Sequence, residues 1–512
     1  MTVLGGLMVG LFIAAIDQTI VATALPEIVS DLGGLDQLSW VIVAYLLTST
    51  ASTPLWGKCG DLFGRRQAYQ ASILVFLAGS LACGFAPSMT GLVFARALQG
   101  IGGGGLFALS FAIVGDIIPP RQRGRYMGYF TAVFASAGVI GPLAGGFITD
   151  HVGWRWIFTV NLPIGAVALV VTSVALRLPF PRRQARLDLL GAGALVAAVT
   201  TLTLVTVWGG DQYGWASTPI VGLSVASVVL FVAFFFWEAR VEEPIVPLRL
   251  FRNPVTAVTL LLSFLLGPVM YGVSSFLPLY LQGTQGVSAT NSGLLLSPNM
   301  LGLTVMSIIT GRMTTRTGRY KHWVVLGTLL LALDVLLLTR LTADTGILLV
   351  GALMVVLGMG LGACMPTLSV SIQNAVPIAD LGVATSTLTF CRTLGGSIGV
   401  AAMGAVLKLQ VEGRLGEVAA ANPLPPGVDA STLANRPTDV QALPDPLRGL
   451  VEGALAHGVA TAFLAVAPVV IACAVIAWWF PELPLRDSSA LVGSPGAKSP
   501  ADAPTITAAP AH

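Results

Sequence analysis

The chain has 512 residues, of which 55% are hydrophobic and only 10% are charged. A soluble globular protein carries roughly 25% charged residues, so this composition excludes a protein whose whole surface faces water. The net charge of +3 gives no reason to expect a nucleic-acid partner. The five cysteines stand singly, without CxxC or Cys/His spacing, so we expect neither a disulfide framework nor a metal site.

A bilayer is crossed by about 20 mostly apolar residues in a helix. Fourteen stretches of the sequence meet this requirement: 3–25, 39–57, 68–86, 89–114, 126–148, 156–176, 189–208, 218–237, 255–281, 291–311, 322–341, 345–368, 382–407 and 456–480. The first is too long for the apolar part of a signal peptide and lacks a small-residue cleavage site. The sequence therefore predicts an all-α polytopic membrane protein.

The basic residues predict how this protein lies in the membrane. With the N-terminus in the cytoplasm, 19 of the 27 basic residues fall in inside segments and 6 in outside segments, while Arg96 and Arg392 lie within helices. Lysine and arginine favour cytoplasmic loops, so both termini are expected there. Low lysine with high alanine and glycine suggests a GC-rich bacterium, and hence a bacterial plasma membrane.

Two segments are not expected to enter the membrane. Residues 409–455 are rich in proline and predict a long outside loop. Residues 487–512 consist mostly of alanine, proline, serine and glycine, which predicts a disordered cytoplasmic tail.

An internal repeat organises the chain. The segments 57–65 and 311–319 share two glycines and an arginine at an offset of 254 residues, and the same offset places Gly141 on Gly395. A duplication predicts two six-helix halves, 1–176 and 255–486, with residues 177–254 inserted as two further helices. Chance matching among the 58 glycines is the alternative.

The segment from Gly57 to Arg66 is a short basic loop with one acid, Asp61. Gly57 and Gly64 allow tight turns. Asp61 can accept hydrogen bonds at the N-terminus of a neighbouring helix or pair with an arginine, and such a contact can hold one conformation closed. Alternatively, Arg65 and Arg66 only anchor the loop in the cytoplasm.

Several segments together resemble the fourteen-helix drug/proton antiporter branch of the major facilitator superfamily. They are 17–26, 57–66, 92–100, 138–146 and 154–158. The resemblance covers residues from about 10 to 480 and implies a monomeric secondary exporter that alternates between inward-open and outward-open states. It implies that the proton gradient drives export of an amphiphilic drug or antibiotic, without a cofactor. A proton-coupled symporter or facilitator for a small metabolite is the alternative.

The resemblance implies that Asp17 and Arg96 couple protons to transport, and the residues themselves support this. Each lies eight residues inside the outer end of its helix, about 12 Å deep. A buried charge at this depth costs about 2.5–3.5 kcal/mol or more unless it is paired or hydrated. We expect the two to be partners or neighbours around a water-filled cavity; a static ion pair is the alternative.

The stretch 138–146 marks exporters in the family that it resembles. Its motif residues are Gly138, Gly141, Pro142, Gly145 and Gly146. Small residues let helices pack closely, while proline and glycine kink them. Ordinary close packing is the alternative.

Other candidates are less determined by the sequence. Arg392 is deep enough to face a cavity, where it binds an anionic group or holds Gln373 or Asn374. Asp334 is either a second titrating group or the partner of a polar neighbour. Asp116, with the basic residues 121–125, forms an inner gate with Asp61 or lies in a solvated loop. Aromatic and apolar side chains that could line a drug pocket are Phe107, Phe134, Met270, Tyr271, Phe276 and Tyr280.

The sequence speaks against an enzyme or an ATP-driven pump. All four histidines, His151, His322, His457 and His512, lie near or beyond predicted helix ends. A pump would need a phosphate-binding loop of the G-x-x-x-x-G-K-[ST] kind, and the sequence holds none.

Overall fold

A computed structural model describes residues 2–33, 38–176, 188–209, 212–287, 297–377, 380–421 and 447–485. Over these residues the fold is helical, apart from one isolated bridge between Gly209 and Tyr213. The long helices are α1 (Thr2–Leu32), α2 (Leu38–Phe63), α3 (Arg65–Gly84), α4 (Met89–Ile117), α5 (Pro120–Val152), α7 (Asn161–Ala175), α8 (Leu189–Trp208), α9 (Thr218–Glu238), α10 (Pro254–Gly283), α12 (Ser297–Thr317), α13 (Lys321–Leu338), α14 (Ile347–Ala375), α15 (Leu381–Ala421) and α17 (Leu447–Trp478). Two short elements are α6 (Trp156–Thr159) and the 3-10 helix η2 (Leu248–Arg252).

Twelve helices in the described part of the chain are long and apolar enough to cross a membrane. The helices α2 and α12 stand where the sequence predicts spans but are not among the twelve, because both carry many polar residues. Much of this polarity faces the protein: Ser52 and Thr53 of α2 are buried, as are Thr310 and Thr314 of α12. The number of membrane crossings therefore stays a prediction.

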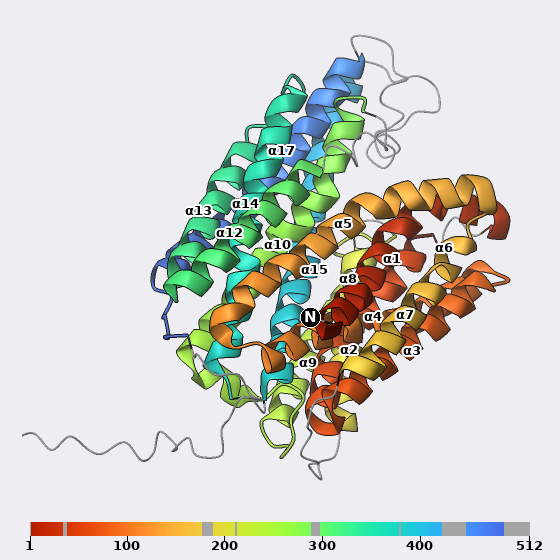
Figure 1. Cartoon of the computed structure of the whole chain (residues 1–512). Helices are drawn as coiled ribbons and strands as arrows, with labels where there is room; N and C mark the ends of the chain where they lie inside the picture. The colour runs from red at the N-terminus through yellow and green to blue at the C-terminus, as the bar shows by residue number, and fades with distance from the viewer. Residues whose placement is uncertain are drawn as a thin grey trace, which may run out of the picture.

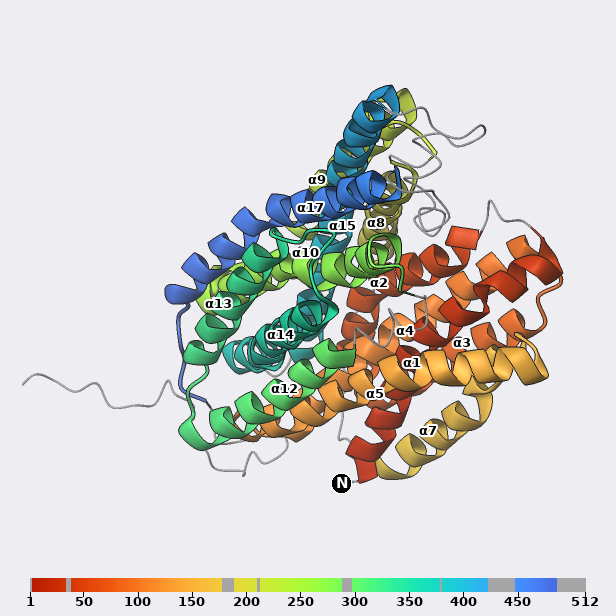
Figure 2. The same ribbon diagram turned by 90° about the horizontal axis from the view of Figure 1, so that it is seen from above.

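The helices form two bundles with the same arrangement of neighbours (Figures 1 and 2). In the first, α1 packs on α5 and α7, while α4 packs on α2 and α3. In the second, α10 packs on α15 and α17, while α14 packs on α12 and α13. We call α1–α7 the N-terminal half and α10–α17 the C-terminal half. Each half has its own apolar core, around Tyr69 and Phe76 in one and around Tyr280 and Phe463 in the other.

The helices between the halves form an antiparallel pair, α8 and α9, which pack on each other. The first of the pair contacts α2 of the N-terminal half and α15 of the C-terminal half. Leu195 and Val199 of α8 share one apolar cluster with Ala51 of α2 and Phe390 of α15. The inserted pair therefore covers a seam between the halves.

Several helix ends differ from those predicted. α1 continues through Pro26 to Leu32, because Ile28 beyond the proline is buried in an apolar cluster with α3 and α4. The predicted outside loop 409–455 is wrong at both ends: α15 reaches Ala421 and α17 begins at Leu447. The remainder of that loop and the predicted tail 487–512 lie outside the described residues.

Candidate functional site

A buried ion pair joins α1 to α4. Arg96 Nη1 donates to Asp17 Oδ2 at 2.6 Å. Asp17 is 0% exposed and Arg96 is 2% exposed. The same guanidinium donates through Nε to the carbonyl of Val41 on α2 at 3.1 Å. The structure thus brings together the two charges that the sequence singles out, each of which would be costly alone.

Neutral side chains donate further hydrogen bonds to the Asp17 carboxylate. Gln99, one helical turn after Arg96, donates to Asp17 Oδ1 at 2.7 Å, and Asn161 of α7 donates to the same oxygen at 3.0 Å. Both amides also donate to the hydroxyl of Ser80 on α3, at 2.6 and 3.0 Å. We call Asp17, Ser80, Arg96, Gln99 and Asn161 the Asp17 cluster. It takes one or more residues from each of four helices.

Aromatic rings close the cluster from the sides. The Arg96 guanidinium carbon lies 4.4 Å from the ring centroid of Tyr45 and 5.8 Å from that of Phe158. Glycines on α4 admit Tyr45, because a Cβ at Gly100 would lie 2.4 Å from the Tyr45 carbonyl oxygen and one at Gly103 would lie 2.4 Å from its hydroxyl. The glycine-rich sequence of α4 therefore allows the Tyr45 ring to pack against Arg96.

In this conformation Asp17 and Arg96 are direct partners, as the first of the two expected arrangements has it. Both side chains are buried, and Gln99 and Asn161 donate to the carboxylate. The amides supply the hydrogen bonds that water would otherwise supply.

A second ionic cluster links the two halves at the end that carries Gly64. Arg65 donates to Asp116 Oδ2 at 2.6 Å and forms an ion pair with Asp61. Asp61 Oδ2 also accepts the N–H of Val383 at 2.9 Å, at the N-terminus of α15. A helix N-terminus presents unpaired N–H groups and a partial positive charge, so a carboxylate is favourable there. Asp61 makes both contacts that the sequence allows.

Close packing surrounds this ionic cluster, which we call the Asp61 gate. Gly57 lies against Ser386 of α15, where a Cβ would come within 2.2 Å of Ser386 Oγ. Gly64 has a positive φ of 100°, which a side chain would strain. Gln373 of α14 donates to the carbonyl of Phe111 on α4 at 3.1 Å. Arg66 is half-buried. The two halves are thus closed at this end, whereas Figure 1 shows them diverging toward their opposite ends.

The glycine motif of α5 lies against α1 close to the Asp17 cluster. A Cβ at Gly141 would come within 1.9 Å of Thr19 Oγ1, and that hydroxyl donates to the carbonyl of Ala137 at 3.1 Å. Gly145 is buried, whereas Gly138 and Gly146 have no neighbour closer than 3.8 Å to such an added carbon. Pro142 lies within α5. Of Gly138, Gly141 and Gly146, Gly141 is the one where close packing requires glycine.

Arg392 lines a small cavity between the halves. The cavity measures about 50 Å³ and is lined from α4, α5, α14 and α15, including Phe111, Thr131 and Ser369. Arg392 Nη1 contacts the sulfur of Met365 at 3.0 Å, and its Nε has no hydrogen-bond partner. A drug-sized molecule needs roughly 300–1,000 Å³, so this space admits at most a few waters here.

The predicted drug-pocket residues are not among those that line this cavity. Phe107 and Phe134 contact each other, with ring centroids 6.1 Å apart, beside α1. Phe276 and Tyr280 belong to the core of the C-terminal half, with Met270 packed against it, and Tyr280 donates to the carbonyl of Thr342. Tyr271 packs where a Cβ at Gly396 would be. These side chains do not form one pocket, because most of them fill cores.

Gln373 and Asn374 do not serve as partners of Arg392. Gln373 contacts Phe111 and Thr385, and Asn374 donates to the carbonyl of Pro484. Asp334 is 0% exposed, and neither of its carboxylate oxygens has a hydrogen-bond partner among the described residues. The alternative that Asp334 reaches a polar group is therefore wrong in this conformation.

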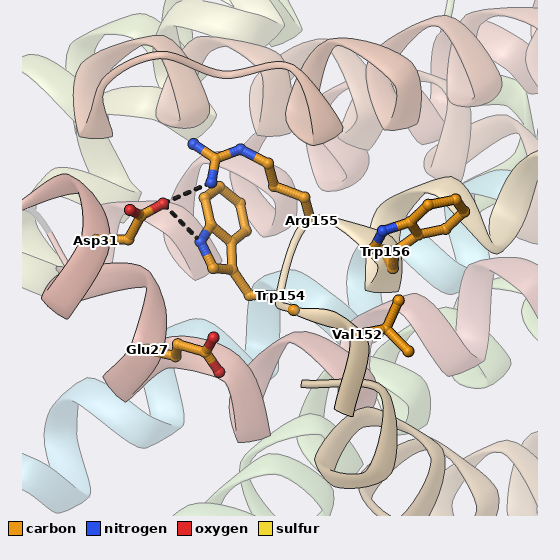
Figure 3. Close-up of a pocket in the computed structure, with 7 residues that line it drawn as sticks. Glu27, Asp31, Val152, Trp154, Arg155 and Trp156 are labelled. Carbon is orange, nitrogen blue, oxygen red and sulfur yellow. Dashed lines mark hydrogen bonds and ion pairs between the residues drawn. The ribbon is translucent and has the colours of Figure 1, made fainter. Parts of the chain in front are cut away.

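A pocket opens beside the C-terminal end of α1 (Figure 3). It measures about 510 Å³ and is lined by Glu27 and Asp31 of α1 and by residues 152–156. Arg155 and Trp154 both donate to Asp31, at 2.5 and 3.0 Å. The hydrogen bond from Arg155, reinforced by that from Trp154, holds the pKa of Asp31 below its ordinary value. Asp31 therefore stays ionised at mildly acidic pH.

Comparisons with known proteins fit this two-bundle architecture. The family model described as the Major Facilitator Superfamily matches residues 7–400. The chain belongs to the major facilitator superfamily. It is thus a multi-pass membrane transporter and not an enzyme.

Relatives within the superfamily include proteins named for drug transport. The chain is 38% identical over 402 residues to the multidrug transporter protein MdtP of Bacillus subtilis, covering 78% of this chain and 74% of that protein. It is 33% identical over 478 residues to multidrug resistance protein 3 of the same organism, covering 92% and 93%. An uncharacterized MFS-type transporter of Mycobacterium tuberculosis is 39% identical over 483 residues, covering 94% and 69%.

Solved structures of the superfamily share the fold. The proton:xylose symporter XylE matches with a TM-score of 0.62 at 14% identity, covering 94% of this chain and 96% of that chain. The human organic anion transporter MFSD10 matches with a TM-score of 0.60 at 16% identity, covering 92% and 99%. At these identities the likeness shows the fold alone.

The sequence gives little sign of the neutral members of the Asp17 cluster. Gln99 lies three residues after Arg96 and so on the same helix face, which is a usable signal. Ser80 and Asn161 are small polar residues within apolar stretches, where most such residues bond only to their own helix. Their role emerges from the packing of α3 and α7 on α4 and α1.

Proposed function

We propose that this transporter exports amphiphilic drugs or antibiotics in exchange for protons. The named multidrug relatives support the substrate class, and the buried pair of Asp17 and Arg96 carries the proton coupling. Export against a gradient needs an energy source, and a proton moving inward supplies about 2.3 kcal/mol per charge for each 100 mV of membrane potential. No cofactor is required for this exchange.

The Asp17 cluster suits a proton-operated switch. As an ionised group, Asp17 accepts hydrogen bonds from Arg96, Gln99 and Asn161. A proton on the carboxylate removes the attraction to Arg96, which holds α1 to α4. A buried ion pair that loses one partner is destabilised by about 3–5 kcal/mol. This is enough to change which of two conformations is populated.

The position of Thr19 extends this effect to α5. Thr19 lies two residues after Asp17 on α1 and hydrogen-bonds to the carbonyl of Ala137 on α5. A shift of α1 at Asp17 therefore disturbs the tight contact with Gly141. Because α5 also packs along α12 of the C-terminal half, this contact offers a route from the proton site to the interface between the halves.

The orientation of the exchange follows from the basic residues. We assign the end with the Asp61 gate to the cytoplasm, because cytoplasmic loops are enriched in lysine and arginine. We also assign fourteen membrane crossings, with α2 and α12 spanning and their polar residues facing other helices. In this assignment the conformation is closed to the cytoplasm, and both termini are cytoplasmic.

The region around Arg392 is the proposed substrate path. It lies between the halves, as expected for a binding site that two rocking bundles expose alternately. Its cavity is too small for a drug in this conformation, so the bundles must separate to admit one. Phe111 and Met127 give it an apolar wall, which suits an amphiphilic molecule.

The test is uphill export of ethidium from proteoliposomes with an imposed pH gradient. We expect wild type to concentrate ethidium and to stop when an uncoupler collapses the gradient. Asp17→Asn should retain a folded protein but export no ethidium uphill. The matched control is Glu27→Gln, which removes an exposed acid from the same helix and should export as wild type does.

Two results would contradict the proposal. Uphill export by Asp17→Asn at the wild-type rate would remove Asp17 from coupling. Movement of ethidium and protons in the same direction would replace the exchange with symport.

A further inference from the structure

Asp334 is a buried acid that the proposed exchange does not use. It lies in α13, is 0% exposed, and has no hydrogen-bond partner at either carboxylate oxygen in the part of the chain that the structure describes. The helix packs against α14 and α17 of the C-terminal half. An ionised carboxylate without any partner in such an apolar site is strongly unfavourable, so Asp334 holds a proton in this conformation.

The internal repeat gives this position a counterpart. The offset of 254 residues that relates the two loop motifs places Ser80 of α3 on Asp334. The packing agrees to within one residue: Gly102 of α4 lies against Phe76 of α3, and Gly360 of α14 lies against Leu331 of α13, whereas the offset gives position 330 for Phe76. Asp334 therefore lies on the helix that corresponds to α3, at or next to the level of Ser80.

The partners of Ser80 have no polar equivalents in the C-terminal half. Gly102 and Gly360 relate α4 to α14 with an offset of 258 residues, which places Arg96 on Met354 and Gln99 on Leu357. Both residues of α14 are 0% exposed. The N-terminal half thus pairs its acid with a base, whereas the C-terminal half keeps its acid among apolar side chains.

No charged side chain of the adjoining helices compensates Asp334. The titratable and charged groups of the packed helices are Cys364 of α14 and Arg448, Glu452, His457 and Cys473 of α17. Arg448 pairs with Glu452, and His457 contacts Arg414. Cys364 lies 3.8 Å from the carbonyl of Val324. Within the described residues, Asp334 therefore has no hydrogen-bond partner.

We propose that Asp334 is a second proton-binding site, located in the C-terminal half. In the conformation described, the carboxyl group holds its proton. When α13, α14 and α17 separate enough to admit water, the O–H bond breaks, the proton passes to water and a carboxylate remains. The reverse step reloads the site, so each transport cycle carries one proton more than Asp17 alone supplies. This inference rests on the proposed proton-coupled exchange.

Infrared spectroscopy of the membrane-reconstituted protein tests the protonation state without a substrate. We expect wild type to show the carbonyl stretch of a protonated carboxyl group that lacks hydrogen bonds, and Asp17→Asn to retain it. Asp334→Asn should lose this band. A band that is absent from wild type, or that persists in Asp334→Asn, would overturn the proposal.

Proton counting tests the role in transport, with ethidium as the probe and a pH-sensitive dye in proteoliposomes. We expect Asp334→Asn to move one proton fewer per ethidium than wild type, and Asp334→Glu to restore the wild-type ratio. Asp334→Ser, which carries the residue of the N-terminal half, provides a second variant if Asp334→Asn does not fold. An unchanged ratio in these acid-free variants would show that Asp334 carries no transported proton.

The outcome separates this inference from the proposed function. If wild type exports ethidium with no proton movement, the exchange itself fails and Asp334 carries no proton in transport. If wild type is coupled and Asp334→Asn has the same proton ratio, only the second site fails.

Discussion

Two buried acids in this transporter show how partners decide the state of a charge. Asp17 is surrounded by Arg96 and two amides, all of which donate to it. Asp334 is equally buried and has no donor within the described residues. The first environment supplies hydrogen-bond donors to a charged oxygen, whereas the second supplies none. The same change of side chain is therefore expected to have opposite effects on stability at the two positions.

Replacing Arg96 should show how strongly the Asp17 cluster depends on its only cation. We expect Arg96→Met to lower the free energy of unfolding by about 3–5 kcal/mol, because it leaves Asp17 buried without its counter-charge. The double variant Asp17→Asn with Arg96→Met should lose less than Arg96→Met alone. Thermal unfolding in detergent measures both effects.

The control for this cycle is a pair at the protein surface. Arg155→Met removes an arginine whose partner Asp31 is about half exposed, and such solvent-screened pairs contribute little to stability. If Arg96→Met cost no more than Arg155→Met, the pair of Asp17 and Arg96 would not hold the helices together.

Replacing Asp334 should raise stability. The side chain is desolvated without gaining a hydrogen bond, and this penalty is about 1–3 kcal/mol for a neutral polar group. We therefore expect Asp334→Val to unfold at a higher temperature than wild type, while Asp17→Val unfolds at a lower one. A fall in the unfolding temperature for Asp334→Val would indicate a stabilising partner for Asp334.

The residues that sequence reasoning can find are those whose burial is costly. Asp17, Arg96 and Asp61 stand out because charges in or beside apolar stretches need partners, and the structure gives each a partner. Neutral residues such as Asn161 carry no such penalty and are not distinguished. Aromatic residues are poor markers of a binding site in the sequence, because they fill cores as readily as they line pockets. Tyr280, for example, lies in the core of the C-terminal half.

At the scale of helices, the contact between α1 and α5 depends on one glycine. A Cβ at Gly141 would overlap Thr19 Oγ1, whereas a Cβ at Gly146 would meet nothing within 4 Å. We expect Gly141→Ala to lower the free energy of unfolding by about 1–3 kcal/mol, as overpacking does, and to slow ethidium export. Gly146→Ala is the matched control and should behave as wild type in both measurements.

A compensating change distinguishes overpacking from other effects of the alanine. Thr19→Ala removes the atoms that the new methyl group would strike, so the double variant Gly141→Ala with Thr19→Ala should recover part of the lost stability. If the double variant is no more stable than Gly141→Ala, the contact with Thr19 is not the cause.

Helix positions follow from the sequence better than helix ends do. Apolar stretches place the helices correctly because membrane-spanning segments must be apolar and helical. The ends depend on tertiary contacts that composition does not reveal. Ile28 packs against α3 and α4 beyond Pro26, and Val411 and Leu415 are buried within a segment that was predicted as a loop. A helix-breaking residue such as proline is therefore a poor guide to a helix end where tertiary packing stabilises the helix beyond it.

At the scale of the whole molecule, the two halves meet at one end through the Asp61 gate. Asp61 contacts Val383, and Gln373 contacts the backbone of Phe111, so α2 and α4 are joined to α15 and α14. The inserted helices add an ionic link, because Lys58 of α2 forms an ion pair with Glu243, which follows α9. In the proposed exchange, the contacts of Asp61 and Gln373 between the halves separate during each cycle.

A covalent bond across this interface should stop transport. A Cβ at Gly115 would lie 3.1 Å from Gln373 Cδ, two bonds beyond the Gln373 Cβ, so α4 and α14 pack closely here. A mobility shift on a non-reducing gel verifies that cysteines at these positions form a bond on oxidation. We expect the double variant Gly115→Cys with Gln373→Cys to lose ethidium export on oxidation and to regain it on reduction.

The matched control is Gly84→Cys with Thr159→Cys, which joins α3 to α6 within the N-terminal half. A Cβ at Gly84 would lie 3.1 Å from Thr159 Cγ2. Oxidation of that pair should leave export unchanged, because a half that moves as one body tolerates a bond within itself. Export that continued in the oxidised Gly115 and Gln373 pair would mean that the halves need not separate at the Asp61 gate, and substrate would then have to reach the cytoplasm by another path.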